Sequence, residues 1–288
     1  MEDSKVALEK PSQWEDDWMY FKGLSNKYKM KSYFDQVEWT IGSVHLMRII
    51  DIYDPSHFWV ITEEKAVDTL HKYINHFYSR YHTHYKLSSN YFRLKMPCVC
   101  LISDNFYRVI LVNVPLQIEK TTWIFVYLMD FGYTAKVPID HIYFMTKNLY
   151  DVPQFAIRAT LSGLGPINQP YWSSAAVTQF INLVSNKVCY GQVTNVNQME
   201  KCLFLQLRDQ NNYQFINSMI TDHLAKSMTI SEIKEIKHTQ KKASKYGKIP
   251  KLPFLSPSFA ELEYGLTGDI HKANEILWEY QRFNLKLV

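Results

Sequence analysis

Carboxylates and arginines near the start of the folded part of the chain suggest one kind of chemistry. Cleavage of a phosphodiester needs clustered carboxylates to hold a metal ion and arginines to bind the phosphate. The candidates here are Asp51, Asp54, Glu63 and Glu64, with Arg48 and Arg108 as isolated cations. The two glutamates stand where a helix is expected to begin, and acids in a first helical turn ordinarily interact with the helix dipole. The sequence also has no GxSxG, Walker or HExxH motif, so we expect neither nuclease activity nor another of these enzymatic activities.

Histidines and cysteines suggest a second kind of chemistry, the binding of a metal ion. His82 and His84 would place both rings on one face of a strand, as a pair of zinc ligands requires. Since no cysteine or carboxylate completes such a set nearby, we expect surface histidines, no metal and no cofactor. The four cysteines form no C-x-x-C pair and are predicted to be buried, reduced thiols: Cys98, Cys100, Cys189 and Cys202.

The composition is that of a folded protein rich in aromatic rings. Of the 288 residues, 47% are hydrophobic, 21% charged and 15% aromatic, so rings can fill a core and still line a binding surface. Nine glycines argue against a glycine-rich phosphate loop, and the net charge of +4 permits an acidic partner without requiring one. The polar N-terminus lacks the apolar core of a signal peptide, and no apolar run reaches the roughly 18 residues of a membrane span. We therefore expect a soluble intracellular protein.

Periodicity in the first half of the chain predicts short strands interrupted by one long helix. Residues 43–64 indicate two strands around a turn at residues 54–56, and residues 65–80 carry apolar positions at helical spacing. Four β-type runs follow between residues 97 and 145, and short strands at this spacing are typical of a small antiparallel barrel. Residues 1–42 are polar with scattered aromatic residues, which predicts an arm that docks in part onto the main domain.

The second half of the chain predicts a strand, a helix, two strands and another helix. These elements are expected over residues 156–161, 171–186, 188–195, 202–208 and 216–228. Residues 237–251 hold six lysines and no acid, which predicts a solvated linker or a basic arm. Apolar residues at helical spacing predict a last short helix over residues 269–283.

This order of elements resembles the extended Tudor domain, in which a five-stranded Tudor barrel interrupts a staphylococcal-nuclease-like OB fold. Five local motifs carry the resemblance: Tyr53–Val60, where a proline turn leads into an aromatic strand; Asp104–Arg108, reading D-N-F-Y-R; Val126–Tyr133, reading V-Y-L-M-D-F-G-Y; the connector Val152–Leu161; and the closing residues Trp172, Phe180 and His223–Ala225. Each motif alone is weak, but their order and spacing make the resemblance to the extended Tudor domain specific.

The resemblance implies a mainly β fold with helices (α+β), a Tudor SH3-like barrel joined to an OB fold. Its expected limits are residues 43–230, with the Tudor barrel at about residues 97–145. Residues 1–42 would be an N-terminal extension, and residues 231–288 a lysine-rich linker with a C-terminal helix.

The Tudor barrel of this family binds methylated arginine in a cage of aromatic rings, and each ring attracts the cation by roughly 0.5–2 kcal/mol. Carried over by position, two of the four rings are kept, as Tyr107 and Phe131. The other rings and the orienting asparagine fall on residues of different chemistry: Leu128, Leu101 or Ile102, and Tyr133. The resemblance therefore implies a degenerate cage that binds methylarginine weakly or not at all. The alternative is that these residues serve only packing and turns, and Asp130 is expected to hold the turn by accepting backbone N–H groups.

The resemblance implies a scaffold or adaptor of the germline piRNA pathway that supports transposon silencing. Its partner would be a Piwi-family protein or another Tudor protein, bound through an arginine-containing peptide in the groove between barrel and OB fold. The expected location is cytoplasmic, in perinuclear germ granules (nuage), with the nucleus as a second location. The alternative function is RNA binding by the OB-like face and the lysines of residues 237–251.

Overall fold

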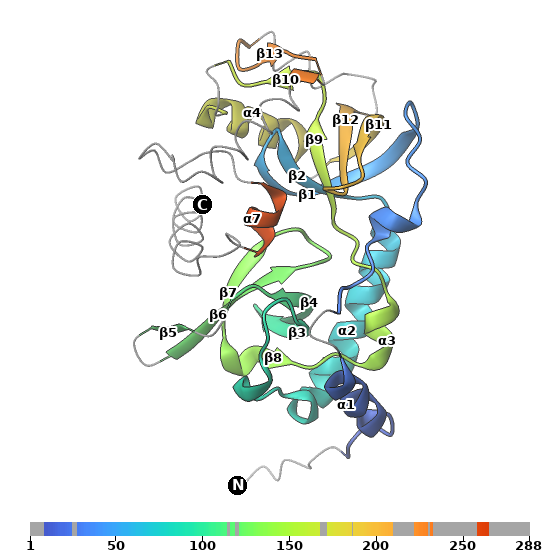
Figure 1. Cartoon of the computed structure of the whole chain (residues 1–288), viewed down its shortest axis with the longest axis vertical. Helices are drawn as coiled ribbons and strands as arrows, with labels where there is room; N and C mark the ends of the chain where they lie inside the picture. The colour runs from blue at the N-terminus through green and yellow to red at the C-terminus, as the bar shows by residue number, and fades with distance from the viewer. Residues whose placement is uncertain are drawn as a thin grey trace, which may run out of the picture. The chain divides into compact units, whose positions relative to one another are not determined.

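The chain forms two compact units, each built from two separate stretches of sequence (Figure 1). Unit 1 comprises residues 1–32 and 65–154, and unit 2 comprises residues 33–64 and 155–288. The computed structural model describes residues 9–24, 28–113, 116–118, 121–167, 172–185, 187–209, 222–229, 231–232 and 258–264. None of the helices in these ranges combines the length and the apolarity that crossing a bilayer requires.

Unit 1 contains a six-stranded antiparallel sheet. Its strands pair in the order β5-β6-β4-β3-β8, and β7 pairs with β6. The bounds are β3 Pro97–Ile102, β4 Asn105–Leu111, β5 Leu116–Ile118, β6 Thr121–Leu128, β7 Thr134–Pro138 and β8 Ile142–Tyr143. Because side chains alternate between the faces of a strand, β4 buries Phe106 and Arg108 while Tyr107 between them stays partly exposed. The strand-rich region predicted between residues 97 and 145 is confirmed.

Helix α2 (Glu64–Tyr85) packs against strand β4 of the sheet. The Asn75 side chain joins the two elements, because its Oδ1 accepts the N–H of Phe106 at 2.8 Å and its Nδ2 donates to the carbonyl of Phe106 at 3.2 Å. The helix is longer than the predicted 65–80. Its buried stripe has the spacing of one helical face and consists of Val67, Ile74, Tyr78 and Tyr85.

Tyr78→Phe is expected to lower the free energy of unfolding by about 1–2 kcal/mol. The Tyr78 ring is fully buried, and its hydroxyl donates to the carbonyl of Phe144 at 2.8 Å and accepts the N–H of Thr146 at 3.2 Å. Phenylalanine would leave both backbone groups without this partner. Urea denaturation measures the change, with Tyr73→Phe at an exposed tyrosine of the same helix as the control. Equal losses in the two variants would show that the buried hydroxyl contributes nothing.

The N-terminal segment docks onto unit 1 through aromatic rings, as the sequence predicts for part of it. Helix α1 (Trp14–Gly23) places the ring of Trp18 5.2 Å from that of Phe144. Its buried Asp17 accepts a hydrogen bond of 2.7 Å from the Tyr85 hydroxyl at the end of α2. Three short helices complete the unit: η2 (Ser89–Tyr91), η3 (Ile139–His141) and α3 (Lys147–Asp151).

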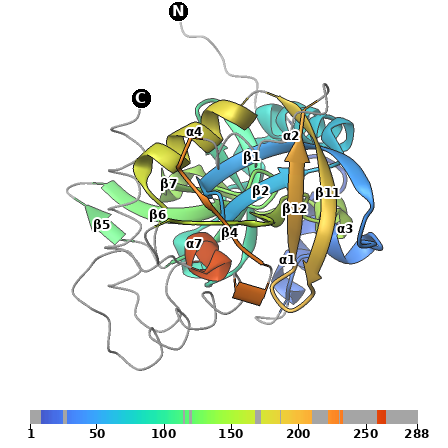
Figure 2. The same cartoon turned by 90° about the horizontal axis from the view of Figure 1, so that it is seen from above.

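Unit 2 contains a closed barrel with strand order β1-β11-β12-β9-β2 (Figure 2). The bounds are β1 Val44–Asp54, β2 His57–Ile61, β9 Ile157–Leu161, β11 Val188–Asn197 and β12 Cys202–Arg208. Every pair is antiparallel except β12 with β9. Alternate residues of each strand fill the interior, among them Phe58, Val60, Ala159 and Leu205.

Helices close the barrel of unit 2. Helix α4 (Ser174–Val184) starts at Ser173, whose side chain accepts the N–H of Ala176, as an N-cap residue does. Phe180 then lies 5.3 Å from the ring of Phe58 inside the barrel. The remaining described elements of the unit are η1 (Tyr33–Gln36), β10 (Leu164–Gly165), β13 (Lys226–Ser227) and α7 (Phe259–Tyr264).

The elements predicted for the second half are confirmed as β9, α4, β11 and β12, and the hairpin predicted for residues 43–64 as β1 and β2. The helix predicted over residues 216–228 is wrong in its described part. There His223 has a φ of 55°, which a right-handed helix excludes, and β13 pairs with β10. Residues 237–251 and the helix expected over residues 269–283 lie outside the described residues.

Candidate functional site

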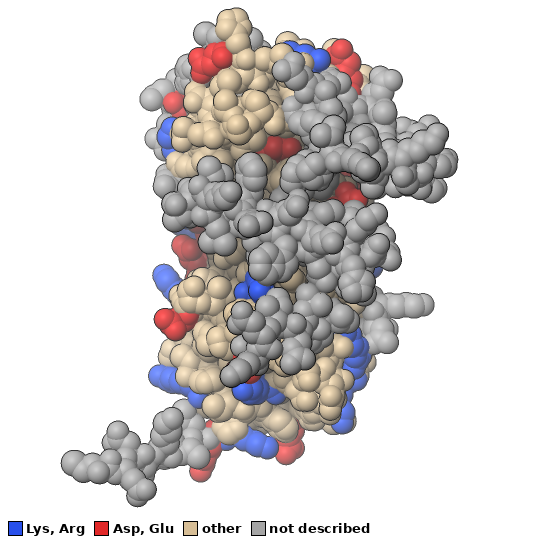
Figure 3. All heavy atoms as spheres, turned by 90° about the vertical axis from the view of Figure 1, so that its left-hand side faces the viewer, with Lys and Arg blue, Asp and Glu red and all other residues tan. Residues whose placement is uncertain are grey.

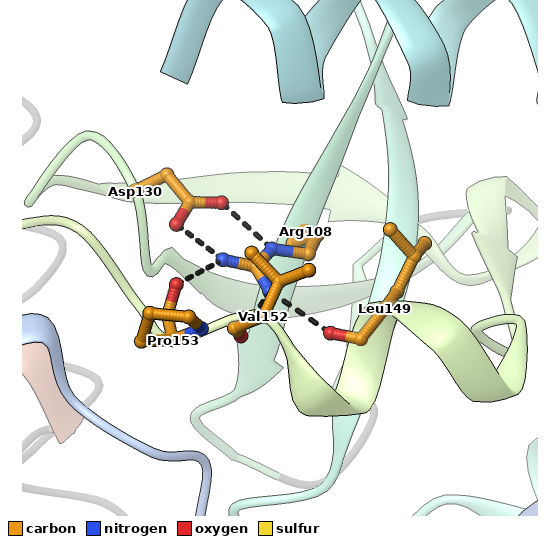
Figure 4. A network of polar contacts seen from close by, with 5 residues as sticks. All are labelled: Arg108, Asp130, Leu149, Val152 and Pro153. Carbon is orange, nitrogen blue, oxygen red and sulfur yellow. Dashed lines mark hydrogen bonds and ion pairs between the residues drawn. The ribbon is translucent and has the colours of Figure 1, made fainter. Parts of the chain in front are cut away.

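A completely buried arginine organises the residues that follow β6. Arg108 lies on β4, and a guanidinium carries five N–H donors. Its Nε and Nη2 donate to the two carboxylate oxygens of Asp130 at 2.9 and 2.6 Å. Its Nη1 donates to the carbonyls of Leu149 and Val152 at 2.9 and 2.6 Å, and Nη2 also donates to that of Pro153 at 2.7 Å (Figure 4). All five donors are therefore used.

Asp130 is held at its turn by this ion pair with Arg108. The assessment of Arg108 as an isolated cation is therefore wrong. The turn itself is tight: Gly132 has a φ of 81°, which favours glycine, and its N–H donates to the carbonyl of Leu128 at 2.9 Å. The N–H of Leu128 in return donates to the carbonyl of Tyr133 at 2.8 Å. These bonds fix the position of Phe131.

Three aromatic rings of unit 1 meet beside this turn. The rings of Tyr107 and Phe131 lie 5.4 Å apart between centroids and 83° apart in plane. The imidazole of His71, on α2, stacks on Tyr107 at 4.7 Å and 27°. It also meets Phe131 at 5.8 Å and 71°. We call these three side chains the ring cluster.

His71 is the residue of the ring cluster that the sequence analysis did not select. A signal for it exists, because position 71 lies four residues after Val67 and three before Ile74, both on the buried face of α2. Its Nε2 is buried and has no hydrogen-bond partner among the described residues. Burial lowers the pKa of the His71 imidazole, and the charge of Asp130 opposes this less strongly. The neutral ring is therefore the favoured form.

Three further predicted site residues lie on other parts of unit 1. Leu128 is fully buried in the core of the sheet. Ile102 ends β3 and pairs with Asn105 across the β3–β4 turn, and it is partly exposed. The Tyr133 side chain is 36% exposed at the turn. The structure thus brings together Tyr107 and Phe131 of the predicted set and adds His71.

The acids considered for phosphodiester cleavage are engaged separately. In unit 2, Asp54 Oδ1 lies 3.0 Å from Nδ1 of the buried His57, and Glu64 pairs with Arg48 at 2.6 Å. Across the described ranges, no group of three His, Cys, Asp or Glu side chains is placed to hold a metal ion. His82 and His84 lie on helix α2, so the strand arrangement considered for a metal pair does not occur. All four cysteines are buried thiols outside any disulfide, as predicted.

Comparison with known proteins agrees with this architecture. The model of the Tudor domain family matches residues 41–163. Three similar solved structures are the extended Tudor domains of mouse TDRD1 (TD3), human TDRD1 and Drosophila melanogaster Papi, with TM-scores of 0.59, 0.60 and 0.58. Their sequence identities are 16%, 15% and 15%, over 70%, 71% and 65% of this chain and 100%, 98% and 100% of theirs.

Residues 41–163 match the Tudor domain family, and the chain has the fold of the extended Tudor domains. The predicted mixed fold with helices is thereby confirmed, and the strands expected to form the Tudor SH3-like barrel pair in the six-stranded sheet of unit 1. The mouse TDRD1 domain was solved with a MILI peptide containing dimethylarginine, and the human domain with a symmetrically dimethylated E2F peptide. A variant of the Papi domain was solved with a Piwi N-terminal peptide. In these solved relatives the extended Tudor domain is therefore a peptide-binding module.

Proposed function

We propose that this chain is an adaptor of the piRNA pathway that binds an arginine-containing peptide through the ring cluster, with little preference for methylation. The partner would be a Piwi-family protein or another protein of the pathway, in perinuclear germ granules. Support comes from the MILI and Piwi peptides bound by the similar domains. The single observation that carries the site is the stack of His71 on Tyr107.

That stack changes what the site can hold. A guanidinium binds a ring by lying over its face, and each good ring contributes roughly 0.5–2 kcal/mol. With centroids 4.7 Å apart, His71 and Tyr107 leave no room for a second planar group between them. One face of Tyr107 is therefore covered by the protein itself. Leu128, buried and aliphatic, supplies no ring in compensation.

Peptide titration tests the proposal. Wild-type protein should bind methylated and unmethylated forms of a Piwi-type arginine peptide within about threefold of each other, and Tyr107→Ala should weaken both at least about tenfold. His71→Ala should restore a preference for the dimethylated form of about tenfold, because it uncovers the Tyr107 face. Isothermal calorimetry measures each affinity. Tyr73→Ala and His76→Ala, which alter exposed residues of α2, are the matched controls.

Two results would contradict the proposal. One is a strong methylarginine preference in the wild-type protein that His71→Ala leaves unchanged. The other is peptide binding that survives Tyr107→Ala. Single-stranded RNA at two salt concentrations tests the alternative function, for which a steep salt dependence is expected. On the face drawn in Figure 3, both acidic and basic side chains of the described residues are present.

A further inference from the structure

The outer face of the barrel in unit 2 carries an aromatic residue and a cation side by side. Strand alternation directs Phe58 and Val60 of β2 into the barrel and Trp59 outward. On β9, Arg158 pairs directly with Trp59 in the register of the two strands. An outward tryptophan would ordinarily be exposed, yet Trp59 is only 2% exposed. Something other than the barrel must cover it.

The cover is the short helix α7. Its Phe259, itself 2% exposed, places its ring 5.3 Å from that of Trp59 in an edge-to-face arrangement and 5.0 Å from that of His57. The guanidinium carbon of Arg158 lies 5.7 Å from the centre of the same ring. The Phe259 ring thus packs against three side chains of the barrel: the indole of Trp59, the imidazole of His57 and the guanidinium of Arg158.

Glu263, four residues after Phe259, supplies the second contact. Its Oε1 accepts from Nε1 of Trp59 at 3.0 Å and from Nε of Arg158 at 2.8 Å, and its Oε2 accepts from Nη2 of Arg158. The Glu263 side chain is 3% exposed and that of Arg158 is 21% exposed, so the ion pair is largely withdrawn from water. Bidentate pairs of this geometry are selective for a carboxylate, because an uncharged side chain would leave the partly buried guanidinium without its counter-charge.

The helix itself depends on this contact. Six residues are too few to form a stable helix in water. Ser258 and Glu261 provide a local start, since the Ser258 hydroxyl and N–H both donate to the Glu261 carboxylate. Residues 233–257 separate α7 in sequence from the preceding described residues. The segment therefore has the features of a short peptide ligand: a capped turn, two anchors four residues apart, and a receptor formed by other strands.

From this arrangement we infer that Trp59 and Arg158 form a binding site for helical peptides with an aromatic residue followed four positions later by glutamate. Helix α7 is the chain's own occupant of this site. A partner protein presenting the same motif displaces it and docks on the outer face of β2 and β9. The site is separate from the ring cluster and does not depend on the proposed function of that cluster.

An exchange experiment with the full-length chain tests the inference. A fluorescent peptide of residues 256–266 is titrated into wild-type protein and into the double variant Phe259→Ala/Glu263→Ala, whose site is empty. A tethered occupant competes at an effective concentration in the millimolar range, so the double variant should bind the peptide at least about tenfold more tightly than wild type. Adding Arg158→Ala to the double variant should abolish this binding. Adding Lys201→Ala, which removes an exposed ion pair with Asp35 in the same unit, should not.

Hydrogen exchange of the wild-type protein gives an independent measurement. The amides of residues 260–264 should exchange faster than those of β2 and β9, because a displaceable segment opens without unfolding the barrel. Equal exchange rates in α7 and these strands would make α7 an integral part of the barrel and overturn the inference. Loss of a cooperative melting transition in the double variant would overturn it too, as would peptide binding that survives Arg158→Ala.

Discussion

Asp130→Asn is expected to lower the free energy of unfolding by about 3–5 kcal/mol, because it leaves the buried guanidinium of Arg108 without its counter-charge. The Arg108 side chain is 0% exposed and that of Asp130 4% exposed. The three carbonyls that Arg108 also contacts are neutral acceptors and cannot replace a charge. The asparagine amide accepts at one atom where the carboxylate accepts at two. The variant also loosens the turn that positions Phe131.

Asp151→Asn is the matched control for this prediction. It makes the same chemical change in unit 1, but in an ion pair with Lys31 whose side chains are 74% and 58% exposed. An exposed pair of this kind contributes about 0–1 kcal/mol. Chemical denaturation followed by circular dichroism compares the two variants. If Asp130→Asn lost no more stability than Asp151→Asn, the central role of the Arg108 network would be refuted.

The Arg108–Asp130 pair marks the limit of what the sequence predicts for this site. Both residues belong to motifs that the sequence analysis selected, yet they are 22 positions apart. What joins them is the register of β4 against β6, in which Val109 faces Leu128. Register follows from the hydrophobic pattern and from the turn that joins two strands, but β5 lies between β4 and β6 in the sequence, so no single turn sets their register. The strands were therefore predictable, and the ion pair between them was not.

The ring cluster shows the same limit for the candidate site. Tyr107 and Phe131 follow from local motifs that resemble the Tudor family. His71 lies on helix α2, more than thirty positions before Tyr107 in the sequence. Helical periodicity predicts that His71 faces the core, but not which ring it contacts. The position of α2 on the sheet, which brings the imidazole over Tyr107, depends on contacts such as Asn75 with Phe106. An aromatic cage inferred from local motifs alone therefore omits His71, which covers one face of the Tyr107 ring.

The helix predicted over residues 216–228 is wrong in its described part, residues 222–228, for a different reason. Its apolar residues do recur at helical spacing, but Ala225 and Met228 are buried in an irregular segment. The positive φ of His223 ends any helix there, and Lys226 pairs in β13 with Gly165 of β10. Tertiary burial can satisfy an apolar pattern without the secondary structure that the pattern favours. Helix α7 is the converse case, a helix too short for periodicity to reveal.

Substitution of Asp51 is expected to raise the stability of the chain, whereas Asp130→Asn is expected to lower it. This residue lies on β1, where it pairs with Trp59 of β2. Burial raises the pKa of its carboxyl from 3.8 to about 7. A carboxyl with a higher pKa in the folded state binds its proton more tightly when folded. Its contribution to stability is therefore fully present below pH 3.8 and is lost as the pH rises towards 7.

Asp51→Asn should accordingly stabilise the chain at pH 8 by about 2–4 kcal/mol, since the amide replaces an ionised, partly buried carboxylate by a neutral group of the same shape. At pH 4, where the Asp51 carboxyl is protonated in the folded state, the two proteins should differ by less than about 1 kcal/mol. Urea denaturation at both pH values measures the difference, with Asp35→Asn at an exposed acid of the same unit as the control. The prediction fails if Asp51→Asn is no more stable than wild type at pH 8. A stabilisation at pH 8 that persists unchanged at pH 4 would instead assign the effect to packing, because only a titrating carboxyl makes the difference depend on pH.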